Sequence, residues 1–140
     1  MIKPALFALA LAATPALADD KAAVGKILDT TFDLCVTAQK KAEKGNAKDK
    51  LRDGWIRERG GWLALQAGEL KVAGRLSLVA RMNCRMVLMQ NGEKPNLDDA
   101  PEDMRLVRGA DRELQTKFQQ QAAKEAPTEE EIAQKFDAHR

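Results

Sequence analysis

The chain of 140 residues has no tyrosine, one histidine, one serine and two cysteines. The histidine is the penultimate residue, His139, and chain termini are usually frayed. A nucleophilic pair of Ser77 and His139 would require the C-terminal segment to fold back, with a third residue to orient the imidazole ring. The sequence therefore offers no combined set of nucleophile, base and metal ligands. We predict that the protein is not an enzyme and carries no cofactor.

Aromatic residues are also scarce, at 4% of the chain, and only two of them are tryptophans. Proteins that bind single-stranded nucleic acid stack the bases on aromatic side chains between basic ones. Trp55 and Trp62 are better explained as large side chains that cover a small core. We therefore predict no nucleic-acid partner.

Long apolar runs are absent except at the N-terminus, where the run is too short to span a membrane. Lys3 precedes an apolar stretch over residues 5–13, and Ala16 and Ala18 then form a small-x-small cleavage site. This pattern predicts a signal peptide over residues 1–18 and a mature chain that begins at Asp19. The predicted location is the periplasm or the extracellular medium, with no membrane span.

The predicted location determines how the two cysteines are interpreted. In an oxidising compartment, two cysteines with no competitor most simply pair with each other. A bond between Cys35 and Cys84 would close a loop of 49 residue steps, for which the chain-entropy model gives about 4 kcal/mol. We predict this disulfide and assign it a structural role.

The first part of the mature chain reads as a helix over residues 19–44. Its apolar residues recur every three or four positions, as in a half-buried helix. They are Val24, Ile27, Leu28, Thr31, Cys35 and Ala38. Lysines at 40, 41 and 44 suit the negative end of the helix dipole, and Gly45 with Asn46 supplies a stop.

The middle of the chain, residues 51–91, permits two interpretations. Five glycines interrupt it, at positions 54, 60, 61, 68 and 74, and each would weaken a helix by about 1 kcal/mol. Apolar and polar residues alternate at Leu70/Val72, Leu76/Leu78 and Met82/Cys84/Met86/Leu88, which favours short antiparallel strands. The predicted fold class is thus α+β, with an N-terminal helix, a small antiparallel sheet and C-terminal helices. The alternative is an all-α bundle, because Leu, Ala, Met, Arg and Glu prefer helix.

Helix is predicted again after the Asn91-Gly92 turn signal. Acidic residues and Pro101 stand where a helix begins, and Met104, Val107, Leu114 and Phe118 form its apolar stripe. We predict one globular domain over residues 19–126. Residues 127–140 are predicted to be a short helix or tail, with a capping box of Thr128 and Glu131.

Charge is distributed unevenly along the chain. Residues 39–94 carry 13 basic and 6 acidic side chains, whereas residues 95–140 carry 7 basic and 11 acidic ones. This pattern is consistent with two complementary halves or with a basic face for an anionic partner. We predict a binding or accessory module for another macromolecule of the cell envelope. The residues predicted to contact it are Lys71, Arg75, Arg81 and Arg85.

A second function is a soft-metal site. On a strand, Met82, Cys84 and Met86 would project from one face, and thioether and thiolate sulfur are ligands for Cu(I). Methionine more commonly fills gaps in a core, and an oxidised Cys84 would have no thiolate. Copper binding is therefore the alternative to the basic binding surface.

Overall fold

The computed structural model describes residues 2–42 and 47–125, with side chains from residue 19 onward, and in this part of the chain all regular structure is helical. The helices are α1 (Ile2–Ala42), α2 (Lys48–Gln66), α3 (Leu70–Gln90), α4 (Pro101–Val107) and α5 (Arg112–Glu125). The prediction of an α+β fold is therefore wrong, and the all-α alternative fits.

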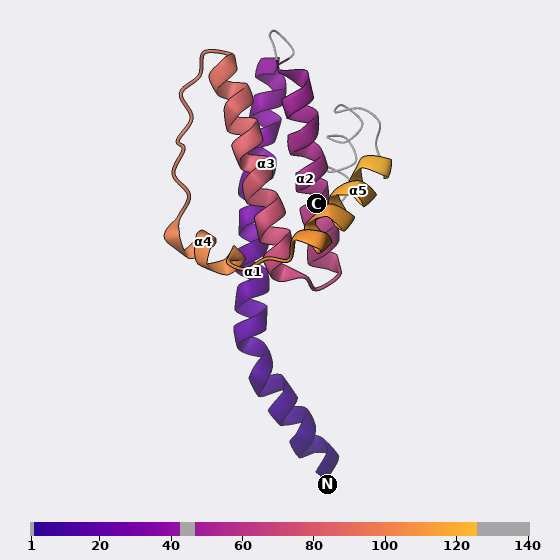
Figure 1. Cartoon of the computed structure of the whole chain (residues 1–140). Helices are drawn as coiled ribbons and strands as arrows, with labels where there is room; N and C mark the ends of the chain where they lie inside the picture. The colour runs from indigo at the N-terminus through magenta and orange to yellow at the C-terminus, as the bar shows by residue number, and fades with distance from the viewer. Residues whose placement is uncertain (1, 43–46, 126–140) are drawn as a thin grey trace.

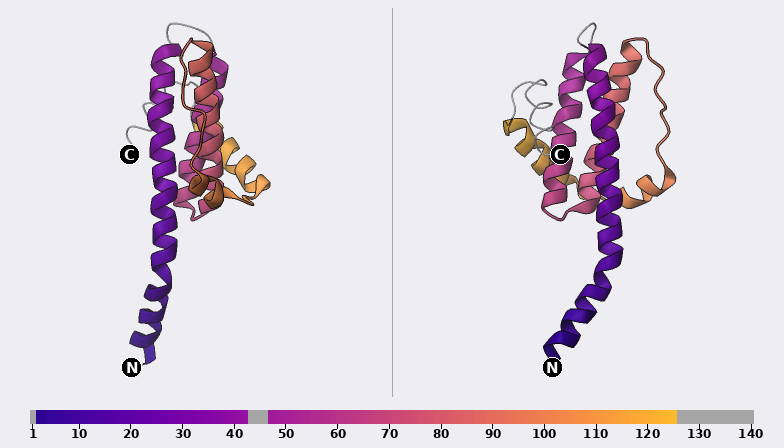
Figure 2. Two further views of the ribbon diagram at one scale, coloured as in Figure 1. Left: turned by 90° about the vertical axis from the view of Figure 1, so that its left-hand side faces the viewer. Right: turned by 180° about the vertical axis from the view of Figure 1, so that it is seen from behind.

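Helices α1, α2 and α3 lie side by side as a three-helix bundle (Figure 1). The first turns of α1 project beyond the bundle, and the segment after α3 runs along its side to α4 (Figures 1 and 2). Helix α5 then packs across α2 at the end of the bundle where α2 turns into α3. None of the helices in the described ranges combines the length and apolarity needed to cross a membrane.

The disulfide joins the first and third helices of the bundle. Cys35 of α1 and Cys84 of α3 are bonded, with 5.2 Å between their Cα atoms, and both are fully buried. Trp55 belongs to the same apolar cluster and meets Phe32 edge to face at 5.3 Å between ring centroids. The predicted disulfide is confirmed, and Trp55 lies in the core beside it.

The helix predicted over residues 19–44 is confirmed as the last part of α1, which ends at Ala42. Every residue of its predicted apolar stripe is buried. The predicted C-terminal helix is present as two helices, α4 and α5, because the chain turns at Gly109, whose φ is +76°. The predicted helix or tail over 127–140 lies outside the described residues.

The predicted strands fail because the glycines have another role. They lie where helices approach one another too closely for a side chain. A Cβ on Gly54 would lie 2.9 Å from Cys84 Sγ, and one on Gly61 would lie 2.8 Å from Leu28 Cδ2. Of the five glycines in this segment, only Gly68, with φ of +81°, lies in a chain reversal, between α2 and α3. Tertiary packing thus outweighs the low helix propensity of glycine.

The alternation at the end of α3 also has a helical explanation. Cys84 and Leu88 are one turn apart and buried, whereas Met82 and Met86 are one turn apart and exposed. Because the buried pair and the exposed pair are offset by two residues, apolar residues occupy every second position of the sequence although the segment is helical.

Candidate functional site: an arginine-lined groove

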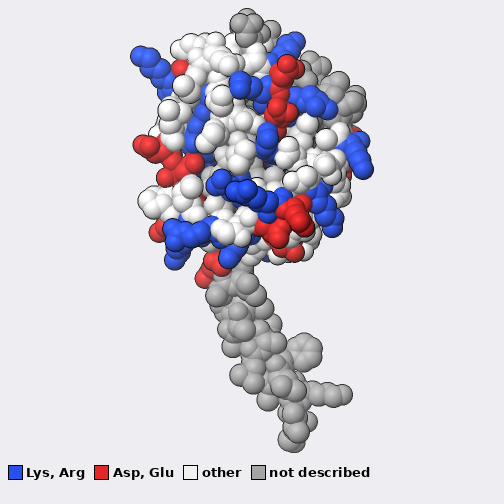
Figure 3. Space-filling view, in the orientation of Figure 1, with Lys and Arg blue, Asp and Glu red and all other residues white. Residues whose placement is uncertain are grey.

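A groove of about 710 Å³ lies where α3 meets α5 and the turn between α4 and α5. Four arginines line it, each from a different part of the chain. They are Arg57 of α2, Arg75 of α3, Arg108 of the turn and Arg112 at the start of α5. The lining includes no aspartate or glutamate. In Figure 3, basic side chains gather across the middle of this face, with acidic side chains on both sides of them.

The turn between α4 and α5 brings two of these arginines to the groove. Gly109 adopts a positive φ, which costs a glycine little and reverses the chain directly after Arg108. The carboxylate of Asp111 then accepts a hydrogen bond from the Leu114 backbone N–H at 2.9 Å and caps α5. Arg112 is therefore placed in the first turn of a capped helix.

The four groove arginines have no carboxylate partner among the described residues. Arg59 is different, because it forms an ion pair with Glu125 at 2.8 Å. Guanidinium groups keep their charge at all physiological pH values and present a planar fork that matches carboxylates and phosphates. The remaining polar groups of the lining are the side chains of Gln115, Thr116 and Gln119. Such a lining is suited to an anion.

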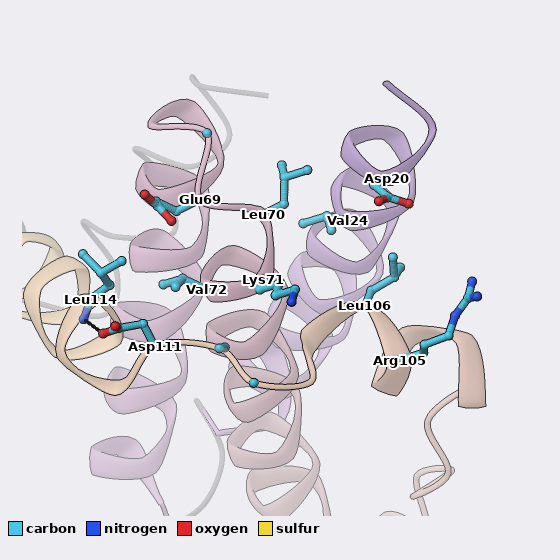
Figure 4. Close-up of a pocket in the computed structure, with 13 residues that line it drawn as sticks. Asp20, Val24, Glu69, Leu70, Lys71, Val72, Arg105, Leu106, Asp111 and Leu114 are labelled. Carbon is cyan, nitrogen blue, oxygen red and sulfur yellow. Dashed lines mark hydrogen bonds between the residues drawn. The ribbon is translucent and has the colours of Figure 1, made fainter. Parts of the chain in front are cut away.

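Of the residues predicted to contact a partner, only Arg75 lines this groove. Lys71 is exposed and lines a separate hollow of about 750 Å³ at the end of the bundle. Figure 4 shows that hollow between α1, the start of α3 and the α4–α5 segment, with acidic as well as basic side chains around it. Its mixed charge makes it a weaker candidate for anion binding than the arginine groove.

Arg81 and Arg85 are buried in the structure, at 5% and 7% exposure, whereas the predicted contact with a partner requires exposed side chains. Both contact the same carboxylate oxygen of Asp99, Arg85 at 2.8 Å and Arg81 at 3.3 Å. Arg81 also donates to the Thr31 hydroxyl and the Ile27 carbonyl at 3.0 Å each. We call this cluster the Asp99 clamp. It fastens the segment after α3 to the bundle.

A buried acid in the core was not anticipated from the sequence. Glu58 of α2 is fully buried, with Ser77 donating to one carboxylate oxygen at 2.7 Å and Trp62 Nε1 donating to the other at 3.1 Å. Burial raises the pKa of Glu58 to about 8, although both hydrogen bonds and the charge of Arg81 act to lower it. Ser77 is equally buried, and His139 lies outside the described residues. This cluster has no access to a substrate and is structural.

The three residues of the copper alternative are not brought together. Cys84 is bonded to Cys35 in the core, while Met82 and Met86 lie on the outer face of α3. Within the described ranges, no group of three or more His, Cys, Asp or Glu side chains is placed to hold a metal ion.

Comparison with known proteins adds no relative: no family model, no curated protein and no solved structure matches the chain.

Proposed function

We propose that this protein is a small exported, non-catalytic module that binds an anionic macromolecule of the cell envelope through the arginine groove. The single observation that carries the proposal is the convergence of four arginines on a groove without an acidic lining residue. Of the residues singled out in the sequence, the proposed binding surface keeps Arg75, and it adds Arg57, Arg108 and Arg112.

The chemistry of the lining supports binding rather than catalysis. Besides the arginines, the groove presents two glutamines, one threonine, two glycine or alanine backbones and four apolar side chains. None of these is a carboxylate, histidine or cysteine that could act as general base beside the threonine. The buried Glu58 lies elsewhere in the core.

Export is part of the proposal and has two supports. The first 18 residues have the order of charge, apolar run and small-residue cleavage site of a signal peptide. The disulfide between Cys35 and Cys84 is the kind of bond that persists in the periplasm or outside the cell.

The proposal is tested by titrating the oxidised protein with two soluble polyanions, heparin and poly-L-glutamate, in an isothermal calorimeter. We expect binding that weakens as salt rises from 0.01 to 0.15 M, because the Debye length falls from about 30 Å to about 8 Å. The triple variant Arg57→Glu/Arg108→Glu/Arg112→Glu should bind at least 10-fold more weakly, since each charge-assisted hydrogen bond contributes about 1.5–3 kcal/mol.

The matched control changes three exposed lysines away from the groove, as Lys26→Glu/Lys40→Glu/Lys48→Glu. It alters the net charge by the same amount, so it separates a local site from a general charge effect. The proposal is wrong if both triple variants lose the same affinity, or if the wild-type protein binds neither polyanion at low salt.

A further inference from the structure

The arginine groove has an apolar part as well as a basic one. Four of its lining side chains are apolar, Leu76 and Val79 from α3 and Met104 and Val107 from α4. Leu76 and Val107 are buried, at 2% and 3% exposure, and Val79 is half-buried. Met104 is 42% exposed, and its thioether side chain adapts readily to irregular apolar surfaces. The lining is therefore suited to contact an apolar group beside an anion.

Basic and apolar side chains follow one another on two walls of the groove. On α3, Val79 comes four residues after Arg75, which is about 6 Å along the helix axis. On the facing wall, Met104 of α4 comes four residues before Arg108, which directly follows the end of α4. Residues four apart in a helix lie on the same face. Each wall thus changes from basic to apolar within about one turn.

The two walls are held together by packing in the core. Val107, between Met104 and Arg108 in the sequence, shares an apolar cluster with Leu78 of α3. It also lies so close to Gly74 that a Cβ there would be 2.7 Å from Val107 Cγ1. The end of α4 is therefore packed directly onto the part of α3 that carries the groove residues, and the order of basic and apolar residues is preformed.

We propose that the groove binds an amphipathic anion, a phosphate headgroup joined to an aliphatic chain, as in a membrane lipid. The headgroup lies among the arginines, and the first methylenes of the chain lie along Val79 and Met104. The arginines favour a phosphate, which carries about −1.5 to −2 charges at pH 7 and three acceptor oxygens, over a singly charged carboxylate. This inference rests on the proposed function, since it names the class of anion that the same groove binds.

The size of the groove fits such a ligand. Its volume of about 710 Å³ falls within the range of roughly 300–1,000 Å³ that is usual for small-molecule sites. Such sites combine apolar walls with a few polar groups that fix the orientation of the ligand. Here the arginines would fix the headgroup, and the apolar ends of the walls would fix the direction of the chain.

The first test compares two phosphate esters with the same headgroup, decyl phosphate below its critical micelle concentration and ethyl phosphate. Both are titrated into the oxidised protein in an isothermal calorimeter. We expect decyl phosphate to bind about 10-fold more tightly or better, because each methylene removed from water strengthens binding about 4-fold. Decanoate should bind more weakly than decyl phosphate. Equal affinities for the two esters, or no binding of either, overturn the proposal, and equal binding of decanoate and decyl phosphate overturns the phosphate headgroup.

The second test locates the aliphatic chain. Met104→Gln should lower the ratio of the decyl to the ethyl phosphate affinity about 5-fold, because an amide loses hydration when an aliphatic chain covers it. Met89→Gln is the matched control, since Met89 is also exposed, at 50%, but lies outside the groove lining. Circular dichroism checks that both variants are folded. An equal loss in the two variants would indicate general adsorption of the chain and would contradict the proposal.

The heparin titration separates this inference from the proposed function. If heparin binds through the groove arginines but the alkyl chain adds no affinity, the amphipathic ligand is wrong and the anion site stands. If neither heparin nor either ester binds, both proposals are wrong.

Discussion

The buried carboxyl of Glu58 makes the stability of this protein depend on pH in a predictable direction. Its pKa is 4.5 in the reference state and about 8 in the folded protein, where burial disfavours the charged form. At a pH between 4.5 and about 8, the Glu58 carboxyl is protonated in the folded protein and ionised in the unfolded chain. The contribution of Glu58 to the free energy of unfolding should therefore be greatest below pH 4.5 and should fall as pH rises to about 8.

The size of this change in the free energy of unfolding follows from the difference between the two pKa values. One pH unit corresponds to about 1.4 kcal/mol for one proton. The interval from 4.5 to about 8 then corresponds to about 5 kcal/mol, a large share of the 5–15 kcal/mol typical of a domain. The hydrogen bonds also fit a neutral acid. Glu58 can donate to Ser77 Oγ, and the Ser77 hydroxyl can then donate to the Ile27 carbonyl, which lies 3.4 Å away.

Urea denaturation of the wild-type protein and of Glu58→Gln at pH 5, 7 and 9 measures the effect. The amide has nearly the same shape, stays neutral and can make the same hydrogen bonds. We expect the variant to match the wild type near pH 5 and to exceed it by several kcal/mol at pH 9. Equal pH profiles for the two proteins would refute the assignment, because every other titrating group is common to both.

Three further outcomes are expected. Cys84→Ser should lower the free energy of unfolding by about 2–4 kcal/mol, and denatured wild-type protein should show no free thiol on titration. Asp99→Ala should lower the free energy of unfolding, measured by urea denaturation, by about 3 kcal/mol, because Arg81 and Arg85 would lose the carboxylate that they share. A decrease below 1 kcal/mol would contradict the Asp99 clamp. Protein recovered after export should have the mass of a chain that begins at Asp19, and a mass that retains residues 1–18 would contradict the signal peptide.

The disulfide could be predicted from the number of cysteines, and the helix through Cys35 could be predicted from the spacing of its apolar residues. Two cysteines allow one intramolecular pairing, and the apolar stripe of α1 recurs at helical spacing. The strands were predicted wrongly because a glycine weakens an isolated helix whatever its surroundings. The close approach of α2 to α3 at Gly54, and of α2 to α1 at Gly61, depends on tertiary structure that the local pattern does not contain.

The groove was only partly predictable for a similar reason. Arg75 was identified from the basic middle of the chain, but Arg108 and Arg112 lie in its acidic part. Only the turn at Gly109 brings them to α3. Glu58 could have been found from helical spacing alone, since it follows Trp55 by three residues on the buried face of α2. The strand interpretation concealed that periodicity.

The arginines of α3 and of the groove fall into two groups that differ in their surroundings. Arg81 and Arg85 are anchored to Asp99 and serve the fold, so replacing them would test stability rather than recognition. Neither Asp99, which is engaged with those two arginines, nor Asp111, which caps α5, lines the arginine groove. The described chain pairs none of the groove arginines with a carboxylate, and a cluster of like charges attracts anions. The groove therefore keeps the unpaired basic lining on which the proposed function depends.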